Sequence, residues 1–382
     1  MIPTSYETSE LQPRRRAFPH RRTAAPWMIV LGTLLLLGGC GKDASDDGSD
    51  ATSASPKPKA TGDLSATNRD SSLDAIERWL TAGRADSATT VARTLAQRLP
   101  EDPHVGLALG RSLLALGSEA RLDPIRGPER ARRLSSEAVE ALQPVYEAWR
   151  SRGAEAAEAR RSLGLALEGS GRLPDAIEIY AEADVQEDPV SRLHLGLALL
   201  RAQRAEDAGI VLSEVESIRP DDPFVVAARA ETALMLEQPE EARALADRAV
   251  QLDTDSWPIR VRRASILRRT GDPRAAVESL LAMDETSRLE LPLLEELTEG
   301  CLDLDRPDAA ASAWATLARA RRDDPRASIT ASLQAAELYA LAGQDEESLI
   351  WLGIARDLDP SDSRIQTCVE DIDRIRAARP SP

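Results

Sequence analysis

One stretch of the sequence repeats itself at a fixed interval. Its first period reads VSRLHLGLALLRAQRAEDAGIVLSEVESIRPDDP at residues 190–223, and the pattern continues to residue 320. An alanine recurs every 34 residues in this stretch, at Ala208, Ala242, Ala276 and Ala310. Repetition with this period is typical of stacked pairs of antiparallel helices, in which each pair packs only on its neighbours.

Two further positions of the repeat indicate how the helices of a pair meet. A small residue stands twelve positions before each alanine: Gly196, Ala230, Ala264 and Thr298. An apolar or larger residue stands four positions after it: Leu212, Ala246, Leu280 and Trp314. Because small residues let two helices approach closely, we expect the second set to fill the contact that the first set permits.

The same pattern extends in both directions beyond this stretch. Its members before the stretch include Ile76, Trp79, Gly83, Ala88, Gly164, Gly171, Ala176 and Tyr180, and those after it include Ala336, Tyr339, Gly343 and Ser348. Together these residues resemble the tetratricopeptide repeat family. The resemblance implies an all-α fold, a right-handed α-solenoid of about eight helix–turn–helix units over residues 71–362.

One unit departs from the regular length. Its first helix is regular around Gly110 and Gly117, but the matching alanine of its second helix is Ala138, which leaves 16 extra residues. The sequence therefore predicts an extra segment near residues 118–133. Residues 363–382 follow the last unit, and Ile365 and Ile372 belong to one apolar face there. We expect a capping helix, since a terminal repeat needs a polar outer face; a partner-binding helix is the alternative.

The N-terminus has the features of a secretory signal. Residues 1–26 are polar and carry five arginines, and residues 27–39 form an apolar run that is shorter than the roughly 20 residues of a membrane span. The run ends in Leu37, Gly38, Gly39 and Cys40, which resembles a bacterial lipoprotein box. That resemblance implies cleavage after residue 39 and a lipid, such as palmitate, on Cys40. An ordinary signal peptide with an incidental cysteine is the alternative.

Residues 40–70 predict a disordered tether, because serine, threonine, aspartate and proline cannot bury enough apolar area to fold. Gly41, in place of aspartate, favours the outer over the inner membrane by analogy with lipoprotein sorting. The whole chain carries −16, and residues 1–40 hold five arginines against two glutamates, or +3, so the remainder carries −19. This charge argues against nucleic acid as a partner.

No group of residues indicates catalysis. The cysteines besides Cys40 are Cys301 and Cys368, which we expect to be buried thiols because a whole unit separates them. The three histidines are far apart, and no zinc spacing, phosphate loop or nucleophile motif occurs. We therefore expect no metal, no cofactor and no enzymatic activity.

By the family resemblance, a partner binds on the inner face, which the first helix of each unit forms. Its expected apolar centre consists of Leu165, Val190, Leu193, Leu197, Leu200, Phe224, Leu234 and Met235. Its expected basic edge consists of Arg161, Arg201, Arg268 and Arg269. Such a groove fits an apolar segment that carries acidic or C-terminal carboxylate groups. Burial of these positions in a tight superhelix, or by a homo-oligomer, is the alternative.

Two functions of different classes follow from these expectations. The first is a membrane-anchored, periplasm-facing lipoprotein scaffold that binds other envelope proteins or peptides in an assembly, export or secretion machine. The second is a regulatory or accessory subunit of a cell-wall or polysaccharide enzyme. The sequence does not identify the partner.

Overall fold

The computed structural model describes residues 66–120 and 127–379, and all regular secondary structure within these ranges is helical. The first helices of the units are α2 (Ala66–Thr81), α4 (Pro103–Ala120), α6 (Ala154–Ser170), α8 (Pro189–Arg201), α10 (Pro223–Met235), α12 (Trp257–Arg269), α14 (Leu291–Asp303) and α16 (Pro325–Leu341). The second helices are α3 (Ala85–Arg98), α5 (Gly127–Trp149), α7 (Leu173–Ala181), α9 (Ala205–Ile218), α11 (Pro239–Leu252), α13 (Pro273–Leu281), α15 (Pro307–Ala320) and α17 (Asp345–Leu358). A short 3-10 helix, η1 (Ser287–Leu289), precedes α14, and α18 (Ser363–Ala377) ends the array. The predicted eight helical pairs and capping helix are confirmed.

The helices of each pair meet at the predicted positions. The four alanines of the 34-residue register are all buried. A Cβ added at Gly196 would lie 2.5 Å from the side chain of Leu212, so any larger residue would force Leu212 to shift. In the seventh unit the small residue is Thr298, and the indole Nε1 of Trp314 donates a hydrogen bond to its hydroxyl over 2.9 Å. The repeat register therefore describes real side-chain contacts.

The irregular second unit keeps this contact despite its extra residues. Ala138 is fully buried, and a Cβ at Gly110 would lie 2.3 Å from Leu142, four residues after Ala138. The extra length enters the helices on both sides: α4 has 18 residues and α5 has 23. Residues 121–126, between them, lie outside the described residues. The described residues of the segment near 118–133 thus lengthen α4 and α5.

The turn between the two helices of a unit requires a left-handed residue. Glycine takes this conformation at Gly83, Gly171, Gly271 and Gly343, whereas Gln203, Glu237 and Asp305 take it with a side chain. The following residue closes the turn; the Gln238 amide, for example, donates to the Ala233 carbonyl over 2.9 Å. This six-to-one hydrogen bond satisfies a carbonyl at the end of the first helix.

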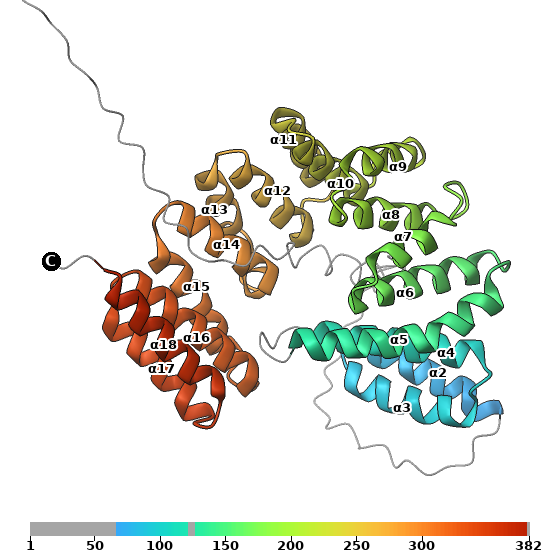
Figure 1. The fold of residues 1–382 in the computed structure, drawn as a ribbon, viewed down its shortest axis with the longest axis horizontal. Helices are drawn as coiled ribbons and strands as arrows, with labels where there is room; N and C mark the ends of the chain where they lie inside the picture. Colours follow the sequence, from blue (N-terminus) through green and yellow to red (C-terminus); the bar gives the residue numbers. More distant parts are fainter. Residues whose placement is uncertain (1–65, 121–126, 380–382) are drawn as a thin grey trace, which may run out of the picture.

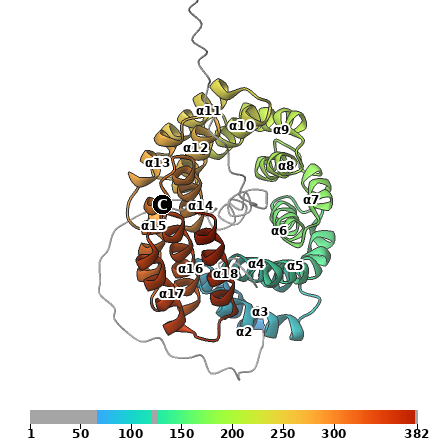
Figure 2. The same ribbon diagram turned by 60° about the vertical axis from the view of Figure 1, so that its left-hand side comes forward.

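The units together form a curved array. Figures 1 and 2 show the chain winding from the α2–α3 pair to the α16–α17 pair, and from α6 to α17 the first helices lie on the inside of the curve. Aspartates begin several helices by accepting hydrogen bonds from their first amides, and the N-cap Asp222 accepts from the amide of Phe224 over 2.9 Å. Asp222 therefore caps α10 directly before Pro223.

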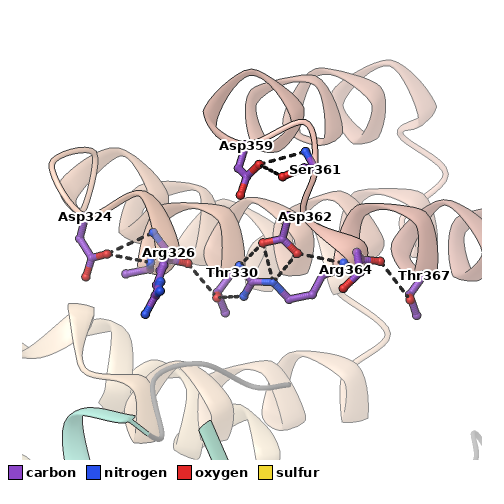
Figure 3. A network of polar contacts seen from close by, with 10 residues as sticks. Asp324, Arg326, Thr330, Asp359, Ser361, Asp362, Arg364 and Thr367 are labelled. Carbon is purple, nitrogen blue, oxygen red and sulfur yellow. Dashed lines mark hydrogen bonds and ion pairs between the residues drawn. The ribbon is translucent and has the colours of Figure 1, made fainter. Parts of the chain in front are cut away.

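Helix α18 covers the end of the array and packs mainly on α16. Its apolar residues Ile365 and Ile372 are buried, as the sequence predicted. Figure 3 shows the polar contacts at its start: Arg364 donates to the N-cap carboxylate of Asp362, and over 2.7 Å to the hydroxyl of Thr330 on α16. The capping helix is therefore fixed by both apolar and polar contacts.

The apolar core is divided along the array. One large cluster contains buried residues from Ala85 to Ala228, and a second contains residues from Val261 to Ile372. Between them lie two small clusters in which most members are alanine or valine. The core is thus thinnest where α10 and α11 meet α12.

Candidate functional site: the inner face

We use the term inner face for the first-helix positions that the sequence assigned to partner binding. Within it, Leu165, Leu193, Leu197 and Leu200 are all buried. These four leucines belong to the large N-terminal core cluster, and helix α8 is in contact with α6, α7, α9 and α10. The prediction of an open apolar centre is therefore wrong at these residues, because neighbouring helices enclose them.

The other predicted apolar residues are half-buried. Val190, Phe224, Leu234 and Met235 retain part of their surface, and the last three also pack against core clusters. They offer a partner only the edges of their side chains. Burial of these positions in a tight superhelix, the alternative given in the sequence analysis, therefore describes the centre of the inner face better than an open groove does.

The predicted basic edge is mostly engaged within the chain. Arg161 pairs with Asp188 over 3.1 Å, and Arg201 pairs with Glu168. Arg268 pairs with Glu296 over 2.6 Å and with Asp303 over 3.3 Å. Only Arg269 among the predicted arginines is exposed. The expectation that these arginines receive a partner's carboxylates is wrong for the first three, because carboxylates of the adjacent unit already occupy them.

These pairs belong to a set of ion pairs between consecutive units. Its other members include Arg111 with Glu77 and Glu158, Arg160 with Asp188, and Arg262 with Glu231. In most of these pairs the two residues lie about one repeat apart, on first helices that are neighbours in the array. Oppositely charged residues about one repeat apart in the sequence could have predicted these pairs. The arginines thus connect the units.

Three carboxylates of later units stand at the inner-face positions that Leu193 and Leu197 occupy in the fourth unit, and they have no ion-pair partner within the described residues. Glu295 and Glu299 are exposed on α14, one helical turn apart, and Glu337 is half-buried on α16. The protein atoms around Glu295 limit its hydration and raise its pKa to about 7, and the charge of Glu299 adds to this shift. Burial also raises the pKa of Glu337 to about 7, and Asp371 on α18 contributes. A cation would relieve the repulsion at both places.

Other candidate sites carry no comparable chemistry. Cys301 and Cys368 are buried free thiols, as predicted. In the described ranges, no three histidine, cysteine or acidic side chains come together in a way that could hold a metal ion. No helix there combines the length and the apolar character that crossing a membrane requires. Cys40 and residues 41–65 lie outside the described residues, so the lipidation of Cys40 stays a prediction. Residues 66–70, which were predicted as the end of the tether, instead form the first turn of α2.

Part of the chain matches a known family model. Residues 129–192, from α5 into α8, match the model of the tetratricopeptide repeat. A search of curated proteins finds no match to the sequence.

Solved structures with a similar fold include other repeat proteins. TTC0263 of Thermus thermophilus is 22% identical with a TM-score of 0.36, and the alignment covers 52% of this chain and 99% of that one. PilF of Pseudomonas aeruginosa is 18% identical with a TM-score of 0.36, over 49% and 86%. Part of a repeat protein of Cytophaga hutchinsonii is 13% identical with a TM-score of 0.37, over 78% and 99%.

Proposed function

We propose that this tetratricopeptide-repeat protein is a lipid-anchored scaffold of the bacterial cell envelope that holds a basic segment of a partner protein on its inner face. Its helical array is of a kind that binds proteins or peptides. The observation that carries the choice of partner is the set of unpaired carboxylates at Glu295, Glu299 and Glu337. We place the protein on the periplasmic side of the outer membrane, within an assembly, export or secretion machine.

The charge of the inner face changes along the array, and this supports a basic ligand. In the middle units, arginines and carboxylates neutralise each other in pairs such as Arg201–Glu168 and Arg262–Glu231. In the seventh and eighth units, the carboxylates at 295, 299 and 337 pair with no arginine of the described part of the chain. A lysine- or arginine-rich segment would gain Coulomb energy there without breaking an existing pair.

The binding surface is tested by charge reversal with a matched control. The full chain and its Glu295→Arg/Glu299→Arg variant are used to capture partners from detergent-solubilised membranes, and the captured proteins are compared. We expect the variant to lose the main partner, with affinity falling about tenfold or more, equivalent to about 1.4 kcal/mol. Glu240→Arg/Glu241→Arg on the outer helix α11 serves as the control and should keep that partner. Equal capture by both variants would exclude this part of the inner face.

The anchor is tested separately. If Cys40 is lipidated, Cys40→Ser should release the protein from the membrane fraction or leave it as an unprocessed precursor. The measurement is the distribution of the protein between membrane and soluble fractions, together with its mass. Wild-type fractionation and mass in the variant would exclude the lipoprotein assignment while leaving the inner-face proposal open to its own test.

A further inference from the structure

Helix α18 takes the place that the first helix of a further unit would occupy. The guanidinium of Arg364 donates to the Thr330 hydroxyl of α16 over 2.7 Å (Figure 3), and the Cys368 thiol lies 3.8 Å from the Leu333 carbonyl. The residues of these two pairs are 34 and 35 positions apart, which is about one repeat length. The two helices therefore run parallel, and their residues face each other in the register of neighbouring first helices.

This register places Glu337 of α16 opposite Asp371 of α18. Each residue lies about one helical turn beyond the thiol–carbonyl contact, on the same face of its helix. At the other end of the array the equivalent positions carry opposite charges, and Glu77 of α2 pairs with Arg111 of α4 over 2.7 Å. At the contact between α16 and α18 both residues are carboxylates, so the contact is repulsive when both are ionised.

No cation in the described part of the chain compensates Glu337. Asp371 is the charged group that acts on it, and Asp371 itself pairs with Arg374 on its own helix. The charged groups of α15 and α17 are engaged elsewhere: Asp345 binds Arg376 and Arg379, and the groups near Tyr339 are Asp308, Arg319 and Glu347. Glu337 therefore meets a neutral thiol and a like charge on α18.

The surroundings of Glu337 favour its protonated form. Burial and the charge of Asp371 raise its pKa to about 7, while a hydrogen bond with the Cys368 thiol opposes the shift. Burial also holds the pKa of that thiol well above its usual value, so Cys368 stays protonated and supplies no charge. A Glu337 side chain freed from α18 would return to its ordinary pKa of 4.5. The docked helix thus holds a proton that the detached helix releases.

We propose that α18 docks on α16 in a pH-dependent manner and detaches more readily as pH rises through neutrality. Because the docked state binds the additional proton, docking is strongest below pH 4.5 and weakens as pH rises to about 7. Detachment would uncover Leu333 and Cys368, which are buried when α18 is docked, and so open the C-terminal end of the array. This regulation requires no partner and is independent of the basic segment proposed above.

The reactivity of the Cys368 thiol measures this detachment in the full chain. Cys368 is 2% exposed and Cys301 on α14 is 1% exposed, so each is protected until its own surroundings open. A thiol-specific disulfide reagent is applied at pH 5.5 and 8, and mass spectrometry gives the labelling rate of each cysteine. Each rate is divided by that of the Glu337→Gln variant at the same pH, because glutamine has the shape of the neutral carboxyl group and cannot ionise. We expect this ratio to rise about tenfold or more for Cys368 and to stay constant for Cys301.

Two further variants test the assignment to Glu337. Glu370→Gln removes a carboxylate from the exposed side of α18 and is the matched control, so it should keep the wild-type rise. Asp371→Asn removes the like charge and should make the rise smaller. Thermal melting followed by circular dichroism at both pH values checks that every variant remains folded. A constant ratio for Cys368, loss of the rise in Glu370→Gln, or an equal rise for Cys301 would overturn the proposal, the last because the whole array would then be opening.

Discussion

His194 shows how a single buried group can make stability depend on pH. Its ring is 1% exposed and stacks on Tyr180 at 5.5 Å between ring centroids, while Arg161 on α6 and the N-cap Asp188 are the charges near it. Burial lowers its pKa to about 4, the charge of Arg161 lowers it further, and Asp188 opposes the shift. The imidazole is therefore neutral in the folded protein over most of the acidic range.

We expect acid to destabilise the protein through His194. Between pH 6.5 and about 4 the unfolded state binds a proton that the folded state does not, so stability falls as pH falls through this window, by about 3 kcal/mol at its end. His194→Leu should reduce the loss in unfolding free energy between pH 7.5 and 4.5, measured by urea denaturation. Identical pH profiles for His194→Leu and wild type would contradict the assignment.

Leu197 is a second residue whose burial has a direct consequence. It is 1% exposed in the core of α8, so Leu197→Asp should bury an unpaired carboxylate and lower the unfolding free energy by about 3–5 kcal/mol. Val190→Asp, at a half-buried site of the same helix, should cost clearly less. Thermal melting of the two variants makes the comparison. If both melted like wild type, Leu197 would be accessible as the sequence first suggested.

At the scale of elements, the repeat register was predictable because it depends on contacts inside one unit. The spacing from Gly196 to Leu212, and the shifted pair Gly110 and Leu142, follow from two helices that are close in sequence. The left-handed turn residue was less evident, because Glu237 occupies a place that Gly271 occupies in the next unit. The residue type at this turn differs between units although the backbone conformation is the same, so the sequence alone does not show the repeated conformation.

This turn offers a stabilising substitution. A non-glycine residue in the left-handed region costs about 1–2 kcal/mol, and glycine avoids this at some cost in unfolded-state entropy. Glu237→Gly should therefore raise the unfolding free energy by about 0.5–1 kcal/mol in chemical denaturation. Glu240→Gly, only three residues on but inside α11, should lower it by a similar amount. A destabilised Glu237→Gly variant would mean that its side chain makes contacts that offset the backbone cost.

At the scale of the whole molecule, the inner face was harder to predict than the fold. Whether Leu197 is open or enclosed depends on how tightly successive units pack, and Arg268 finds Glu296 in a different unit. Periodicity places such residues on a helix face but does not decide what covers that face. The unpaired carboxylates at 295, 299 and 337 emerge only after the arginines have been matched with their partners.

The division of the core makes a prediction about cooperativity. Each unit packs only on its neighbours, so the array unfolds as one body only while every junction between units is stable. Around α10 and α12 the apolar clusters are small, and the buried pair Glu231–Arg262, 3.2 Å apart, lies across this junction. Burial raises the pKa of Glu231 and lowers that of Arg262, as expected for charges held away from water.

Glu231→Ala should therefore weaken the middle of the array more than its ends. Removing one member of a buried ion pair typically costs about 3–5 kcal/mol, because the other charge stays buried. Differential scanning calorimetry of the variant should show two transitions, one for the N-terminal and one for the C-terminal cluster, in place of a more cooperative wild-type profile. Glu240→Ala on the exposed surface of α11 is the control and should preserve that profile. A single, unshifted transition in Glu231→Ala would show that the alanine-rich contacts hold the two halves together without the ion pair.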